Sequence, residues 1–92
     1  MNEIRTEEEF SANQHAGAVF AITDTATGNK VHVLPCSYVK ADYFRMKVIV
    51  GRNKNGRYYV CDSVDEAEGR LGARRCSCVG AAQPARRDAG VT

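Results

Sequence analysis

The residues of this 92-residue chain with the most obvious chemical potential are four cysteines and two histidines. His32 and Cys36 are four positions apart, and Cys76 and Cys78 are separated by a single residue. Cysteine and histidine are the usual ligands of structural zinc, but such sites normally use Cys-x-x-Cys knuckles, and a one-residue gap strains tetrahedral geometry. The spacing favours reduced thiols, so we predict no metal and no cofactor, with a zinc-stabilised interaction domain as an alternative.

The same residues do not form a catalytic pattern. Cys36 and His32 could act as nucleophile and base only if the turn after the strand placed both on one side. The carboxylates of Glu7, Glu8 and Glu9 spread around a helix, so no pair is placed for acid and base catalysis. The glycines stand singly rather than in a phosphate-binding loop. We therefore predict a protein that is not an enzyme and has no small-molecule substrate.

Charge is the second candidate source of function. Residues 30 to 61 contain seven basic and one acidic residue, whereas residues 1 to 29 contain one basic and five acidic residues. A basic block of this kind is a solvated surface, a phosphate-binding surface, or a docking surface for an acidic protein. Composition alone leaves these three readings open.

Two capping boxes predict the helices that flank this basic block. Thr6 with Glu9 predicts the start of a helix over residues 7–15, and Ser63 with Glu66 predicts a second helix that runs to about Leu71. In each box the side chain of the first residue can accept a hydrogen bond from the amide of the fourth.

Short runs rich in β-branched and aromatic residues predict four strands, over residues 18–23, 30–34, 43–50 and 57–62. The first two form a hairpin that turns at Gly28 and sets Phe20 opposite Leu34. The last two form a hairpin around an Asn-Gly pair, with Val50 opposite Val60.

These elements predict a small single α+β domain over residues 1–72, in the order α-β-β-β-β-α. Its sheet has four antiparallel strands in two hairpins, with an N-terminal and a C-terminal helix. Residues 73–92 are predicted to be a mobile basic C-terminal tail. No apolar run is long enough to span a bilayer, and the acidic N-terminus is unlike a signal peptide, so we expect a cytoplasmic protein.

Apolar and basic residues alternate along the third predicted strand, which makes one face of the second hairpin basic. Cations at strand spacing can each neutralise a phosphate while a tyrosine offers a stacking surface. The predicted partner-binding residues are Lys40, Arg45, Lys47, Arg52, Lys54, Arg57 and Tyr59. A solvated face and docking on an acidic protein surface remain alternatives.

A small antiparallel sheet with two capped helices and this basic hairpin resembles the small inhibitor proteins that phages use against host defence, among them anti-CRISPR proteins. The resemblance covers general character over residues 6–72 rather than a motif. It implies a non-enzymatic inhibitor that docks on a CRISPR-type ribonucleoprotein complex of the bacterial host cytoplasm and keeps it from target DNA by occlusion. Because inhibitors that imitate DNA are acidic, the basic centre favours contact with guide RNA or an acidic subunit. The alternative is a free-standing RNA- or DNA-binding regulatory module.

Overall fold

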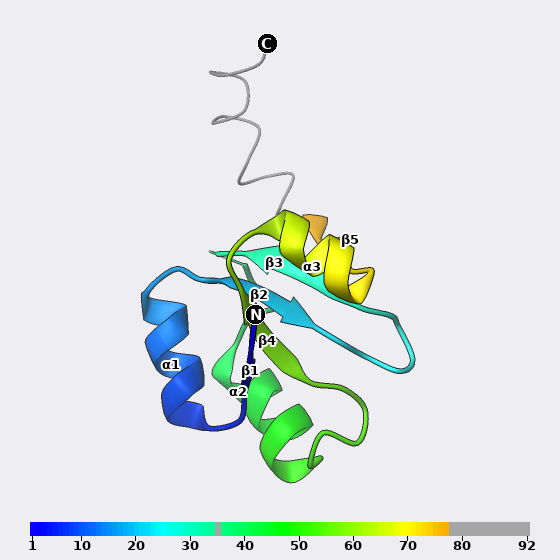
Figure 1. The fold of residues 1–92 in the computed structure, drawn as a ribbon. Coiled ribbons are helices and arrows are strands. Elements are labelled where there is room, and N and C mark those ends of the chain that lie inside the picture. Colours follow the sequence, from blue (N-terminus) through cyan, green and yellow to red (C-terminus); the bar gives the residue numbers. More distant parts are fainter. Residues whose placement is uncertain (35, 78–92) are drawn as a thin grey trace.

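A five-stranded mixed sheet forms the centre of the fold, with strand order β1-β4-β2-β3-β5 (Figure 1). The computed structural model describes residues 1–34 and 36–77. Its elements are, in chain order, β1 (Asn2–Ile4), α1 (Glu7–His15), β2 (Val19–Ile22), β3 (Lys30–Val33), α2 (Ala41–Phe44), the π-helix η1 (Arg45–Val50), β4 (Tyr58–Cys61), α3 (Val64–Leu71) and β5 (Arg74–Arg75). The predicted class, a small α+β domain, is confirmed. The predicted four-stranded antiparallel sheet with two helices is not.

Both predicted capped helices form where the sequence places them. The Thr6 hydroxyl accepts from the Glu9 amide, and the Glu9 carboxylate accepts from the Thr6 amide, each at 3.1 Å. At α3 the Ser63 hydroxyl accepts from the Glu66 amide at 3.1 Å, but the Glu66 carboxylate accepts from the amide of Asp62 instead of closing the box. Local side-chain chemistry therefore sets the start of both helices.

The prediction of a strand over residues 43–50 is wrong, because this segment is helical. α2 and η1 run without interruption from residue 41 to residue 50; we call them together the α2–η1 helix. Phe44 and Val48, one helical turn apart, are buried, whereas Met46 and Val50 are exposed. The basic β-hairpin that this strand would have formed is therefore absent.

The remaining pairings also differ from the predicted hairpins. β4 lies between β1 and β2, with Tyr58 opposite both Ile4 and Ile22. β2 and β3 do form the predicted antiparallel hairpin, but Phe20 pairs with His32 rather than with Leu34. The shift of two residues keeps the faces of the sheet and lengthens the loop between the strands.

The helices cover the two faces of the sheet separately (Figure 1). On one face, Phe10 of α1 stacks on Phe44 of the α2–η1 helix at 4.9 Å between ring centroids. Both rings contact Tyr58 of β4, and Phe10 also contacts Phe20 of β2. All four rings belong to one buried cluster. On the other face, α3 packs its small residues against a second cluster that includes Val31. The fold thus has two small cores, one on each face.

The predicted tail does not begin at residue 73. Ala73 and Cys76 are buried, and β5 pairs in parallel with β3, with Lys30 opposite Arg74. The remainder of the predicted tail, residues 78–92, lies outside the described residues. Among the helices that the structure describes, none has the length and apolar character needed to cross a bilayer.

Candidate functional site

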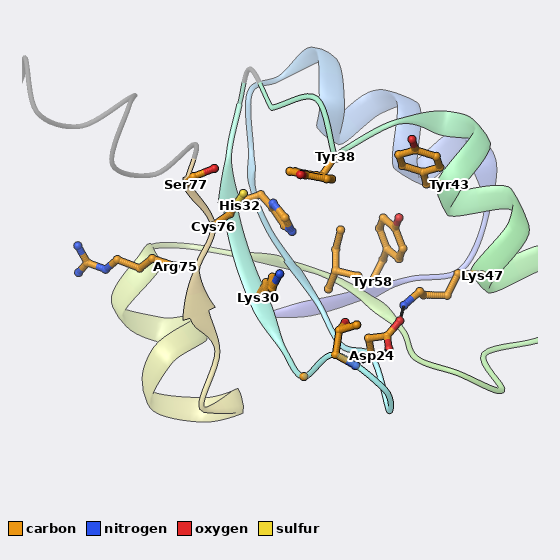
Figure 2. A pocket seen from close by; sticks show the side chains of 13 residues that line it. Asp24, Lys30, His32, Tyr38, Tyr43, Lys47, Tyr58, Arg75, Cys76 and Ser77 are labelled. Atoms are coloured by element: carbon orange, nitrogen blue, oxygen red, sulfur yellow. Dashed lines mark hydrogen bonds and ion pairs between the residues drawn. The ribbon is translucent and has the colours of Figure 1, made fainter.

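Three of the predicted phosphate-binding cations form ion pairs within the protein. Arg45 contacts Glu7 of α1 at 3.0 Å, and Arg57 contacts Glu3 of β1 at 3.0 Å. Lys47 points toward the β2–β3 loop and donates to Asp24 at 2.6 Å (Figure 2). Each of these three cations therefore binds a different part of the protein, and together they do not form the predicted row.

The Lys47 contact is the most protected of these ion pairs. Its ammonium also donates to the carbonyl of Thr23 at 3.1 Å, and the Asp24 carboxylate accepts from the amides of Ala26 and Thr27. The hydrogen bond from Lys47 and then the two amides hold the pKa of Asp24 well below its ordinary value. Lys47 thus joins the α2–η1 helix to the β2–β3 loop.

The other predicted residues have different surroundings. The ammonium of Lys40 lies 5.6 Å from the centroid of the Tyr43 ring, which is cation–π range. Arg52 and Lys54 are exposed in the loop after the helix, and within residues 1–34 and 36–77 neither has an acidic partner. Tyr59 packs on the α3 side of the sheet, not beside these cations.

The outer surface of the α2–η1 helix is apolar. Four of its large side chains are exposed, by 42 to 63% of their surface: Tyr43, Met46, Ile49 and Val50. The helix ends at Gly51, where there is no room for a side chain: a Cβ atom there would lie 2.8 Å from the carbonyl oxygen of Lys47. Together with Lys40, Arg52 and Lys54, these four side chains form what we call the helix surface.

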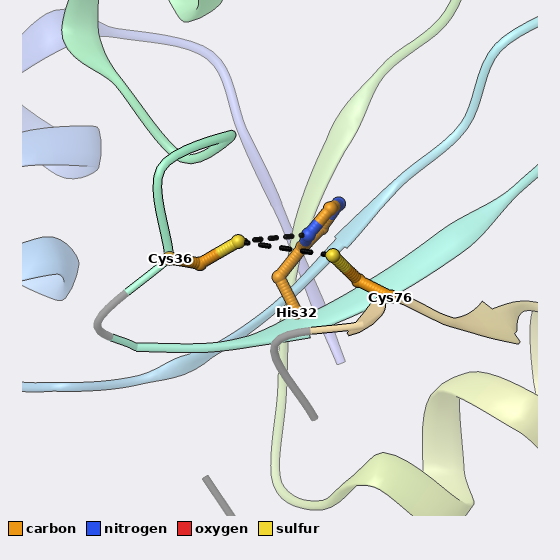
Figure 3. A group of neighbouring side chains, drawn as sticks. All are labelled: His32, Cys36 and Cys76. Carbon is orange, nitrogen blue, oxygen red and sulfur yellow. Dashed lines mark hydrogen bonds between the residues drawn. The ribbon is translucent and has the colours of Figure 1, made fainter. Parts of the chain in front are cut away.

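A second group of chemically active side chains meets near the edge of the sheet where β5 pairs with β3. Figure 3 shows His32, Cys36 and Cys76 pointing toward one another, and we call them the thiol–imidazole cluster. Cys36 Sγ lies 3.4 Å from His32 Nδ1 and 3.9 Å from Cys76 Sγ. The three potential ligand atoms all lie within 4.8 Å of one another.

Backbone pairing explains why these three residues meet. His32 lies on β3, and Cys36 follows at the end of that strand. Gly72, in the left-handed conformation at φ 60°, ends α3 and turns the chain back toward β3. The amide of Cys76 then donates to the carbonyl of Val31 at 3.0 Å, which places Cys76 beside His32.

The cluster lies at one end of a cavity of about 550 Å³. His32 and Cys76 line that end, and Tyr43 and Lys47 of the α2–η1 helix line the other (Figure 2). Tyr58 lines it as well, and burial raises the pKa of this tyrosine to about 12, so its hydroxyl stays protonated. The cavity therefore connects the two candidate sites.

The imidazole of His32 is held in its neutral form. Its side chain is only 4% exposed, and burial, together with the nearby charge of Lys30, lowers its pKa to about 4. A neutral imidazole keeps a lone pair on one ring nitrogen, which is the form that binds metals.

The sequence predicts only part of this cluster. The spacing of His32 and Cys36 indicates a possible pair of ligands, but Cys76 falls beside Cys78 in the predicted tail. Cys78 lies outside the described residues. The signal for Cys76 was the helix-ending Gly72 followed by a short run that could return to the sheet.

Comparison of the chain with protein-family models, with curated proteins and with solved structures gave no match. The helix surface and the thiol–imidazole cluster are therefore the features from which function is inferred.

Proposed function

We propose that this protein is a non-enzymatic inhibitor that docks on a nucleic-acid-handling ribonucleoprotein complex through its helix surface. The observation that supports this is the exposure of four large apolar side chains on one helix, with Met46 at 63% and Val50 at 62%. Isolated exposed apolar residues are ordinary, but a contiguous group on one helix is typical of an interaction surface.

The charges beside this group favour an acidic partner. Lys40 precedes the helix and Arg52 and Lys54 follow it, and all three are exposed, so cations stand at both ends of the helix that carries the apolar group. An apolar centre with a charged rim is the usual arrangement of a protein interface. Acidic protein side chains or RNA phosphates at the rim would complement the three cations.

A CRISPR-type surveillance complex of the bacterial cytoplasm offers both kinds of group, in its subunits and its guide RNA. Binding there would act by occlusion, as in the anti-CRISPR proteins that the chain resembles in general character. The structural basis differs from the one expected from sequence, because a helix rather than a β-hairpin carries the contact residues. A zinc-stabilised form of the domain is compatible with this role, since a metal would stabilise the fold and leave the helix surface exposed.

The test is a pull-down with the tagged full chain from a CRISPR-positive bacterial lysate, with and without nuclease. A double variant, Met46→Asp with Val50→Asp, disrupts the apolar centre. Its control, Ser11→Asp with Ala12→Asp, adds the same charge at exposed positions of α1. We expect the wild type and the control to capture a stoichiometric ribonucleoprotein that survives nuclease. The double variant should not capture it.

Two results would reject the proposal. Recovery of only nuclease-sensitive bulk nucleic acid, with a steep loss of binding as salt rises, would indicate the free-standing nucleic-acid-binding module. Equal capture by the wild type and by the double variant would show that the helix surface is not the contact.

A further inference from the structure

We infer that His32, Cys36 and Cys76 bind a single zinc ion. The three side chains come from two different segments of the chain and converge at one point of the sheet (Figure 3). Their donor atoms are one imidazole nitrogen and two sulfurs, a set that zinc prefers and that magnesium and calcium do not. This site is independent of the docking surface proposed above.

Two of the three distances between the donor atoms match those around a tetrahedral ion. With zinc–sulfur bonds of about 2.3 Å and zinc–nitrogen bonds of about 2.05 Å at tetrahedral angles, neighbouring sulfurs lie about 3.8 Å apart and a nitrogen lies about 3.6 Å from a sulfur. The cluster has 3.9 Å between Cys36 Sγ and Cys76 Sγ, and 3.4 Å between Cys36 Sγ and His32 Nδ1. The third pair, His32 and Cys76, lies within 4.8 Å. An ion therefore fits with side-chain movements of about 1 Å or less.

Strand pairing and backbone hydrogen bonds of the fold hold the segments that carry the cluster. His32 is held in β3 between β2 and β5. The carbonyl of Cys36 accepts from the amide of Val39 at 3.1 Å, and the amide of Cys76 donates to β3. Donors that are held in place bind a metal with little loss of conformational freedom.

The charge balance also suits zinc. Two thiolates would neutralise the two positive charges of the ion and a histidine ligand adds none, so that a buried site carries no net charge. Three protein donors leave one tetrahedral position for water or for a fourth donor.

A disulfide between Cys36 and Cys76 is the main competing explanation. Bonded sulfurs lie about 2.05 Å apart, so the observed 3.9 Å would have to close by nearly half. A disulfide would also leave unexplained why an imidazole nitrogen lies 3.4 Å from one of the two sulfurs.

The test uses the purified full chain, stripped with a chelator under reducing conditions and titrated with cobalt(II), then with zinc(II). We expect binding of one equivalent, with thiolate-to-cobalt charge-transfer absorption and the intense visible bands of tetrahedral cobalt, which zinc then removes. Cys36→Ser and Cys76→Ser should each weaken cobalt binding by more than about 100-fold, because loss of even an outer partner of a metal ligand costs 10- to 100-fold.

Cys61→Ala is the matched control, since Cys61 is also a buried cysteine but lies on β4 in the core beneath α3. It should keep the cobalt spectrum and the affinity of the wild type. Circular dichroism checks that each variant folds, and alkylation of the wild type with mass analysis gives a readout that needs no variant, because zinc should protect Cys36 and Cys76.

Three results would overturn the inference. One is binding well below one equivalent in the reduced wild type. Another is binding that Cys61→Ala weakens as much as Cys36→Ser does. The third is a Cys36–Cys76 disulfide in the protein as isolated, together with failure of the reduced protein to bind cobalt or to show zinc-dependent protection.

Discussion

The ion pair between Lys47 and Asp24 should contribute measurably to stability, unlike the exposed pair of Arg45 with Glu7. Lys47→Met keeps most of the aliphatic stem and removes the ammonium, together with its hydrogen bonds to Asp24 and to the Thr23 carbonyl. A hydrogen bond to a charged group contributes about 1.5–3 kcal/mol and a neutral one about 1 kcal/mol. The side chains of Lys47 and Asp24 are 16% and 25% exposed, which reduces these values through solvent screening. We expect Lys47→Met to lower the free energy of unfolding by about 2 kcal/mol.

The assay is urea unfolding of the wild type, Lys47→Met, Asp24→Asn and the double variant, which together give the coupling energy of the pair. We expect about 1–2 kcal/mol of coupling. The matched control is a cycle on Arg45 and Glu7, whose side chains are 47% and 50% exposed. Exposed pairs of this kind contribute little to stability and often nothing measurable.

The pH dependence of this coupling follows from the lowered pKa of Asp24. In the unfolded chain an aspartate titrates near 3.9, and in the folded protein Lys47 and two amides hold the pKa well below that value. The stabilisation is therefore complete above about pH 5 and is lost as the pH falls below about 4. Coupling as small as that of the Arg45–Glu7 pair, or coupling that stays constant down to pH 3, would contradict the structural role assigned to Lys47.

Three further predictions test the fold and the metal. In urea unfolding, Val48→Asp should lower the free energy of unfolding by more than about 3 kcal/mol and Met46→Asp by less than about 1 kcal/mol, because the helix buries Val48 and exposes Met46. Similar losses for the two variants would favour the predicted strand over the helix. Gly56→Ala should cost more than about 2 kcal/mol in urea unfolding, since its Cβ would overlap a backbone carbonyl after β2. Gly28→Ala meets no neighbouring atom and should cost only the strain of a side chain at φ 89°, about 1–2 kcal/mol. Adding a chelator to the zinc-loaded, reduced protein should lower its Tm by several degrees and should not change the Tm of Cys36→Ser; an unchanged wild-type Tm would argue against a stabilising metal.

The parts of the fold that were predictable from sequence are those with local causes. The capping residues Thr6 and Ser63 act within four positions, and both helices begin where they indicate. β2 and β3 also follow from their β-branched and aromatic residues. Their register was wrong by two residues because Asp24 accepts from two amides and from Lys47, which builds a wider loop than a three-residue turn.

The segment 41–50 shows why a short apolar pattern is ambiguous. Phe44, Met46, Val48 and Val50 alternate as in a strand, but Phe44 and Val48 are also one helical turn apart, and the sequence contains both periods. The stacking of Phe44 on Phe10 decides between them, and that contact joins residues distant in the sequence. Tertiary packing therefore overrode a run of residues with high strand propensity.

The two missed strands and the thiol–imidazole cluster share one cause. β1 and β5 are three and two residues long, and each is defined by a partner far along the chain, β4 and β3 respectively. Such short segments carry no periodicity of their own. Cys76 reaches His32 only because β5 pairs with β3, so the third donor of the cluster could not be placed from spacing alone.

The position of the cluster is consistent with a limit on how far the two cores extend. The core beneath α1 and the α2–η1 helix takes buried side chains from β1, β2 and β4, and among the described residues it takes none from β3. A domain of this size has too little apolar surface to cover every strand, and small domains often add a metal or a disulfide where packing ends. At that place on β3 the side chain is His32, 4% exposed and next to two sulfurs, instead of an apolar residue. A zinc ion there would join the end of β3 to the chain that follows β5, on the face where this core takes no buried side chain from β3.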